Sequence, residues 1–110
     1  MSPLRLEQFV EKRLIDDLLA LEGIYCVSLI SPDGFILESS GTKTDLTSIV
    51  NLFDLRPKNT MVTTVGENGT IIGIRLESNH ILAVLCEVSS NLGRVRLEIE
   101  SIGKTLSSIL

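Results

Sequence analysis

The residues of this 110-residue chain that could do chemistry are few and far apart in the sequence. A hydrolase or transferase of the ordinary kind needs a nucleophile oriented by a base, and the only histidine, His80, lies beside Asn79 in a predicted tight turn. Metal binding needs ligands at short spacings, whereas Cys26 and Cys86 are 60 positions apart on predicted strands. We interpret His80 as a solvated turn residue and expect neither a metal site nor a bound cofactor.

Two further patterns that can carry phosphate binding or catalysis also point away from an enzyme. The segment Gly66-Glu67-Asn68-Gly69 lacks the Gly-Lys-Ser/Thr ending of a phosphate-binding loop, and it joins two predicted strands without opening a helix. The acidic residues are dispersed along the chain, at positions such as Asp16, Asp33 and Asp54, and none forms a recognisable catalytic pair. The sequence therefore predicts a protein that is not an enzyme.

Composition and charge narrow the range of partners. The net charge is −4 and the aromatic residues are one tyrosine and three phenylalanines, so the chain lacks the basic surface and the stacking residues that nucleic-acid binding usually needs. No segment reaches the length of a membrane span, and charged residues interrupt the first thirteen positions, so we expect no signal peptide and no membrane insertion. Both cysteines lie inside apolar runs, which predicts reduced thiols in a cytoplasmic protein. The length suits one domain, residues 1–110.

Hydrophobic periodicity and turn residues predict eight elements in the order α-β-β-α-β-β-β-α. Thr42 or Thr44 could cap the second helix, and Pro57 prevents that helix from continuing much further. The expected ranges are a helix from Ser2 and Pro3 to Gly23, strands 24–30 and 35–39, a helix 45–55, strands 60–65, 70–76 and 81–86, and a final helix from near Ser90 to Ile109.

The composition of the strands predicts their order in the sheet. Residues 81–86 are apolar at every position and residues 24–30 nearly so, so these two strands should be central and covered on both faces. The more polar strands around Phe35 and Met61 then lie at the edges of an α+β fold. Its five-stranded antiparallel sheet has the order 2-1-5-4-3, with two helices on one face and one on the other. A sheet of five strands is about 20 Å across and one helix covers about 10 Å, so the single helix should leave about half of its face open in a monomer.

The second helix and the third strand are the expected site of pairing. The helix carries one wide apolar stripe, made by Leu46, Ile49, Val50 and Phe53. Leu52 and Leu55 point away from the centre of this stripe, and the edge strand 61–65 has none of the lysines, prolines or inward charges that usually block pairing. Joining two such edges across a twofold axis would extend the sheet. The alternative is that Leu52 and Leu55 are scattered surface residues and that twist shields the edge.

Three segments carry a more specific pattern. They are residues 18–24 (LLALEGI), 31–37 (SPDGFIL) and 91–98 (NLGRVRLE). The succession of helix, glycine, strand, Asp-Gly turn and strand, followed by Leu-Gly-x-x-Arg after the apolar fifth strand, resembles the roadblock family of dynein light chains and prokaryotic relatives such as MglB. The resemblance covers nearly the whole chain.

The resemblance implies a homodimer, or a heterodimer with a roadblock paralogue, that serves as a platform for small Ras-like GTPases or motor complexes. Some prokaryotic members act as GTPase-activating proteins by positioning the GTPase's own switch loops, so the implied role is that of an activator or a scaffold. Carried over by helix position, the dimer residues would be Leu46, Ile49, Val50, Phe53, Met61, Val62 and Thr64. The residues available to the partner would be Thr47, Ser48, Asn51, Leu52, Asp54, Leu55 and Arg56.

Three arginines could contribute to such a surface. Arg56 ends the exposed helix, so it could act as an arginine finger that stabilises transition-state charge in a bound GTPase. The favoured interpretation is simpler, because a cation at a helix C-terminus complements the helix dipole. Arg94 and Arg96 lie near the start of the last helix, where positive charge is unfavourable, so either a salt bridge or a partner contact could retain them.

Other functions remain open at this stage. Profilin-like and PAS-like sheets of similar layout enclose ligands between sheet and helix, so a small-molecule sensor is one alternative. An adaptor subunit of a motor or cytoskeletal complex is another. An unrecognised enzyme would need a polar pocket with a strongly perturbed carboxylate or cysteine.

Overall fold

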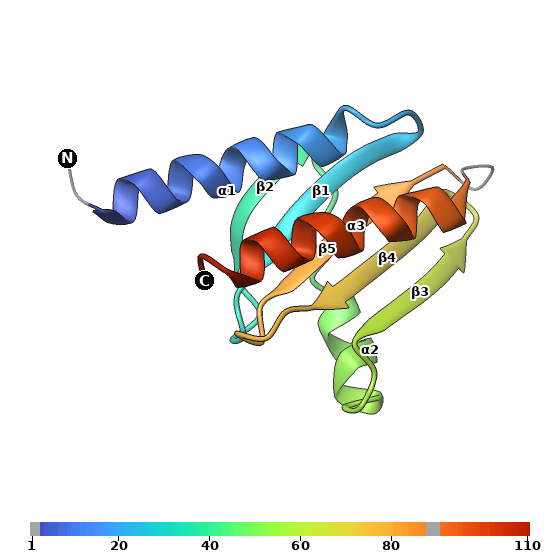
Figure 1. Ribbon diagram of the computed structural model, residues 1–110. Helices are drawn as coiled ribbons and strands as arrows, with labels where there is room; N and C mark the ends of the chain where they lie inside the picture. Colours follow the sequence, from blue (N-terminus) through green and yellow to red (C-terminus); the bar gives the residue numbers. More distant parts are fainter. Residues whose placement is uncertain (1–2, 88–90) are drawn as a thin grey trace.

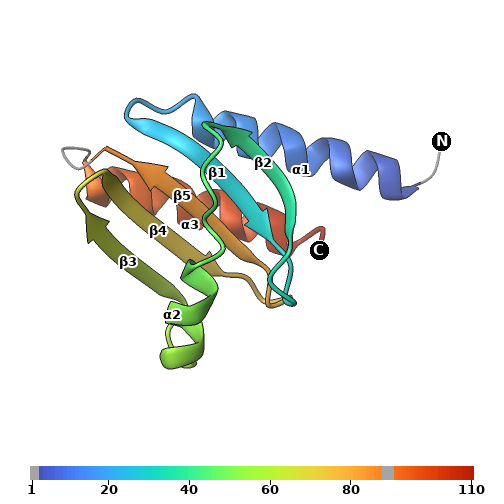
Figure 2. The same ribbon diagram turned by 180° about the vertical axis from the view of Figure 1, so that it is seen from behind.

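The chain forms a five-stranded antiparallel sheet with helices on both of its faces (Figures 1 and 2). The computed structural model describes residues 3–87 and 91–110, and in the first helix it describes side chains from Phe9 onward. The elements are α1 (Pro3–Leu19), β1 (Ile24–Ile30), β2 (Ile36–Gly41), α2 (Ile49–Leu55), β3 (Met61–Gly66), β4 (Gly69–Arg75), β5 (Ile81–Cys86) and α3 (Leu92–Ser107). The strand order is β2-β1-β5-β4-β3, so the predicted order of elements and strands is confirmed.

One face of the sheet is covered by α1 and α3, which run across it side by side (Figure 1). Their apolar stripes pack against the sheet, where Ile15 and Ile99 are fully buried and Leu18 is 1% exposed. The central strands contribute alternate residues to this layer, such as Leu82 and Val84 of β5. Alternation along a strand sends the residues between them to the opposite face, which explains why β5 is apolar at every position.

The other face is covered by α2 and by the extended segment that leads to it. Figure 2 shows the segment after β2 crossing the sheet before it enters α2 near β3 and β4. Leu46 of this segment is fully buried, and with Ile49 and Phe53 of α2 it packs on Ile30 and Ala83. The segment therefore closes part of the face that the sequence analysis left open. What stays partly open there is the area around Ile71, Leu85 and Thr64.

The second helix is shorter than predicted. It begins at Ile49, four residues after the predicted start, and Ser48 precedes it without a capping hydrogen bond from its side chain. The Asp45 carboxylate instead accepts hydrogen bonds from the backbone N–H and the hydroxyl of Thr47, at 2.9 and 2.6 Å. A short acidic side chain that binds the backbone two residues on competes with helix formation. Thr42 and Thr44 bond to each other and cap no helix.

The outer helices end earlier than predicted, since α1 ends at Leu19 and not at Gly23, and α3 ends at Ser107 and not at Ile109. Asn91 caps α3 by accepting a hydrogen bond from the Arg94 N–H at 3.2 Å, whereas Ser2 and Ser90, the predicted starts of the outer helices, lie outside the described residues. Gly23 has a φ of +86°, a left-handed conformation that favours glycine where the chain turns from α1 into β1. Both cysteines are free and buried, Cys26 beneath α2 and Cys86 beneath the other helices. None of the helices described has both the length and the apolar character needed to span a bilayer.

Candidate functional site

The predicted site lies on α2 and on the free edge of β3. We name it the α2–β3 surface. It consists of Thr47, Ser48, Val50, Asn51, Leu52, Asp54, Leu55 and Arg56 around α2, together with Thr64 and Val65 of β3. Because α2 is seated over β3 and β4, these two elements lie at the same side of the molecule (Figure 2).

The helix side of this surface combines exposed apolar and polar side chains. Leu55 is 78% exposed, and Val50 and Leu52 are half-buried. Asn51, Asp54 and Arg56 are exposed next to them. An exposed leucine at the end of a helix whose other face is buried leaves apolar area for a partner to cover.

Three of the residues predicted to make the dimer contact do not reach this surface. Leu46, Ile49 and Phe53 are at most 1% exposed in the single chain, because they fill the layer between α2 and its own sheet. They cannot touch a second copy directly in this conformation. Val62 is also buried, and Met61 packs on the side of α1 and α3, which leaves Val50 and Thr64 as the predicted dimer residues that are accessible beside α2.

The backbone of β3 has a free edge. The Arg75 N–H donates to the Thr60 carbonyl oxygen at 2.7 Å, and hydrogen-bonded pairs in an antiparallel ladder recur at every second position. Residues 62, 64 and 66 therefore turn their backbone groups toward β4, whereas residues 61, 63 and 65 turn theirs outward. Val65 is 66% exposed, and no described side chain hydrogen-bonds to these outward groups. This edge can accept a further strand.

The opposite edge of the sheet, at β2, is blocked. The Lys12 ammonium of α1 donates to the Ser39 carbonyl oxygen at 3.1 Å and to the Ser40 hydroxyl at 2.9 Å. A carbonyl already bound by a lysine is not free to pair with another strand, and lysine at an edge is a common way to prevent pairing. The Asp16 carboxylate, one turn further along α1, lies 3.6 Å from the ammonium of the same lysine. The two edges of the sheet are therefore not equivalent.

The α2–β3 surface continues toward the turn between β1 and β2. A hollow of about 410 Å³ separates Gly34 of this turn from the start of α2 and is lined by Gly34, Asp45, Thr47, Ser48, Val50 and Asn51. The next three residues after Gly34 are all exposed apolar side chains, Phe35, Ile36 and Leu37, with Phe35 at 69%. We predicted them as part of a strand and not as part of the site. The signal that could have added them to the predicted site is the run of three consecutive apolar residues directly after a turn.

Asp45 at the margin of this hollow stays ionised to lower pH than an ordinary aspartate. Hydrogen bonds from the Thr47 hydroxyl, and then from the Thr47 N–H, lower its pKa below the usual value of 3.8. Because the pKa in the folded chain is depressed, the stabilisation is complete above the usual pKa and is lost as the pH falls through the lowered one. We expect Thr47→Ala to raise the Asp45 pKa toward 3.8 in a carboxyl-carbon NMR titration. An unchanged pKa would show that the hydroxyl plays no part.

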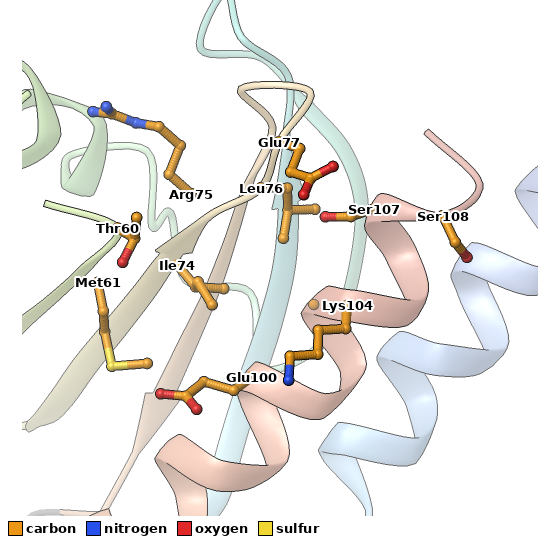
Figure 3. Close-up of a pocket in the computed structure, with 11 residues that line it drawn as sticks. Thr60, Met61, Ile74, Arg75, Leu76, Glu77, Glu100, Lys104, Ser107 and Ser108 are labelled. Carbon is orange, nitrogen blue, oxygen red and sulfur yellow. The ribbon is translucent and has the colours of Figure 1, made fainter. Parts of the chain in front are cut away.

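A second hollow lies on the other face, between α3 and the ends of β3 and β4 (Figure 3). It has a volume of about 420 Å³, with Met61, Ile74 and Leu76 on the sheet side and Glu100 and Lys104 on α3. Figure 3 shows the Arg75 side chain pointing away from this hollow, although its backbone lines it.

The chemistry-bearing residues are not brought together by the fold. His80 is half-buried, and its Nδ1 lies 2.7 Å from the Ser78 hydroxyl within the same turn, so it is less solvated than predicted. Among the side chains that the structure describes, no three histidine, cysteine or acidic residues cluster as metal ligands would. Arg96 donates to the Thr63 hydroxyl at 3.2 Å, a contact within the chain. A contact of Arg96 with a partner stays a prediction. The Arg56 side chain is exposed, and the cation that meets the end of α2 is Arg75.

Comparisons with known proteins identify the fold. No family model and no curated protein matches the sequence. Among solved structures, a Roadblock/LC7 domain from Streptomyces avermitilis matches with a TM-score of 0.73 and 16% identity, covering 88% of this chain and 94% of that one. Myxococcus xanthus MglB matches at 0.70 and 21%, covering 98% and 97%. LokiProfilin1 in complex with rabbit actin matches at 0.69 and 15%, covering 100% and 98%.

The fold and its surface thus define an α+β protein of the roadblock and profilin class. Within this class the chain has the roadblock fold, in agreement with the resemblance seen in the sequence.

Proposed function

We propose that this chain is a non-catalytic interaction module that pairs with a second roadblock chain through the α2–β3 surface and binds a small Ras-like GTPase. The single observation that carries the proposal is the free β3 edge beside an α2 helix with exposed apolar side chains. A strand edge supplies backbone hydrogen bonds, and the adjoining apolar residues supply area to bury. The two together favour a protein partner over a small molecule.

The contrast between the two sheet edges supports pairing at β3. Lys12 donates hydrogen bonds to the edge strand β2, whereas no described side chain hydrogen-bonds to the outward backbone groups of β3. Twofold pairing of two β3 strands would continue the sheet and place two α2 helices next to each other. The half-buried Ile71 and Leu85, on the same face of the sheet, would then come closer to the partner's helix and lose exposed area.

The GTPase part of the proposal rests on the sequence resemblance and on the roadblock fold. The polar residues of α2, among them Asn51 and Asp54, would contact the GTPase while the apolar ones pack between chains. The chain acts in this proposal as an activator or a scaffold. A cytoplasmic location fits a partner of this kind and two free, buried cysteines.

The sensor alternative has less support from the geometry. The layers between sheet and helices are filled by fully buried side chains, such as Leu82 and Ala83 of the central strand. The two hollows described above lie at the margins of the helices and are lined by exposed residues, among them Glu100, Lys104 and Asn51. A ligand-enclosing domain needs a concave site that buries most of its ligand.

The test combines mass in solution with binding to GTPases. Sedimentation over a range of concentrations is expected to give twice the chain mass of 12.0 kDa for the homodimer, or for an equimolar mixture with a paralogue. The dimer is then presented to each small GTPase of the source genome in its GDP and GTP forms, and to actin as the adaptor control. Binding to actin alone, or to none of these proteins, would contradict the GTPase proposal.

Leu55→Ser separates partner binding from folding. Because Leu55 is 78% exposed, its replacement should change the free energy of unfolding by no more than about 0.5 kcal/mol. Binding of the GTPase, or of the second chain, should weaken by about 10- to 150-fold, since an exposed leucine that becomes buried contributes on the order of 1.5–3 kcal/mol. Leu97→Ser is the matched control, because Leu97 is similarly exposed on α3. Equal binding by both variants would remove Leu55 from the interface.

A further inference from the structure

The C-terminal end of α2 is held by a side chain from a different part of the sequence. The Arg75 guanidinium, at the end of β4, donates to the carbonyl oxygen of Phe53 at 3.2 Å and to that of Pro57 at 2.7 Å. The same guanidinium lies 5.0 Å from the centre of the Phe53 ring. These contacts satisfy carbonyls at a helix end and place a cation there, both of which stabilise the last turn.

The backbone of the same residue holds the start of β3. The Arg75 N–H donates to the Thr60 carbonyl oxygen at 2.7 Å, just before β3 begins. Between Phe53 and Thr60 the chain makes only a short turn, with the Asn59 N–H donating to the Arg56 carbonyl oxygen. One residue of β4 thus fixes both ends of the connection between α2 and β3.

The helix needs such a contact because its own sequence supplies little support. It has seven residues, no side-chain hydrogen bond at its N-terminal cap and no basic residue in its last turn. Helices this short are not stable by themselves, so tertiary contacts must set their position. On the same face of β4, Gly73 makes room for the helix, since a Cβ there would clash with Ile49 Cδ1.

We infer that Arg75 is the positioning residue of the α2–β3 surface: it locks α2 and β3 into one unit, so that the helix side chains and the strand edge meet a partner in a fixed arrangement. The expected effect of Arg75 on pairing rests on the proposed function, whereas the contacts that Arg75 makes do not. Among the described residues the guanidinium has no acidic partner, so its hydrogen bonds are committed to the α2 end. A residue that served only the core would not need to bridge two carbonyls of a connecting segment.

The test compares Arg75→Gln and Arg75→Lys with two controls. Arg96→Gln removes an arginine that also contacts β3, through the Thr63 hydroxyl, but from the opposite face. Ile99→Val lowers overall stability from the other core layer, since Ile99 is fully buried beneath α3. Each full-length variant is measured by hydrogen exchange resolved along the chain and by its dissociation constant for self-association.

Arg75→Gln is expected to speed exchange across residues 49–60 by about 100-fold relative to β5, because it removes two charge-assisted hydrogen bonds that contribute on the order of a factor of ten each. Its self-association should weaken by a similar factor. Arg75→Lys, which keeps the charge but cannot bridge both carbonyls, should lie between Arg75→Gln and the wild type, and it serves as the test variant if Arg75→Gln does not fold. The controls should leave the ratio of exchange between residues 49–60 and β5 unchanged.

Unchanged exchange in the Arg75 variants, or the same local change in Ile99→Val, would overturn the positioning role. If the wild type does not self-associate at all, the proposed pairing fails, and the exchange measurement still decides the role of Arg75. If the wild type and Arg75→Gln pair equally well and exchange alike, the pairing stands and the Arg75 inference fails.

Discussion

Replacing Phe53 with alanine is expected to lower the free energy of unfolding by about 3–5 kcal/mol, the range for a fully buried aromatic side chain. Phe53 is 1% exposed and is the largest fully buried side chain of the described residues. Its ring lies under α2 next to Gly73 and the Arg75 guanidinium, so its removal empties the layer between α2 and the sheet. Since small domains are stable by about 5–15 kcal/mol, the variant would lose a large share of its stability.

Phe35→Ala is the matched control for this prediction, because it deletes the same side chain at an exposed position. Phe35 is 69% exposed, so its replacement should change the free energy of unfolding by no more than about 0.5 kcal/mol. Both values come from urea denaturation at equilibrium, at a protein concentration where the oligomeric state is the same. A Phe53→Ala loss as small as that of Phe35→Ala would mean that α2 is not seated on the sheet as described.

Val65→Pro is expected to weaken pairing strongly while leaving the single chain folded. Position 65 turns its N–H outward from β4, so proline there removes a donor that only a second strand would use, and proline is tolerated at such edge positions. In a twofold interface each substitution acts twice. We expect the dissociation constant for self-association to rise by on the order of 100-fold, which corresponds to losing one hydrogen bond of about 1.4 kcal/mol in each half.

Thr64→Pro tests the geometry behind this prediction, because it lies one residue away on the same strand. Position 64 turns its N–H toward β4, so proline should break a hydrogen bond within the chain and lower the free energy of unfolding. Sedimentation gives the oligomeric state of both variants, and thermal denaturation at low concentration gives their stability. If Val65→Pro pairs as tightly as the wild type, the β3 edge is not the interface.

The architecture could be predicted from the sequence because it depends on local patterns. The unbroken apolar run 81–86 could be satisfied only at the centre of the sheet, and the Asp33-Gly34 turn set a hairpin beside it. The free edge at β3 could also be anticipated, because strand 61–65 carries no blocking residue. These features follow from the periodicity of side chains along short segments, and tertiary contacts did not alter them.

The start of α2 and the use of its apolar stripe could not be predicted in the same way. Periodicity shows that Leu46, Ile49 and Phe53 must be buried, but it does not show against which surface. The pattern was compatible with packing against a second chain, but in the structure all three side chains pack against the chain's own sheet. The late start of the helix, at Ile49 and not at Asp45, followed from a side-chain hydrogen bond of Asp45 that competes with the helix.

Taken alone, the sequence determined the order of the elements and the layout of the sheet, because neighbouring residues encode these features. Tertiary structure alone decided which edge is closed and what holds α2. Lys12 reaches Ser39, and Arg75 reaches Phe53, across 27 and 22 positions of the chain. Contacts of that span depend on how the layers pack, and no local pattern of residues specifies them.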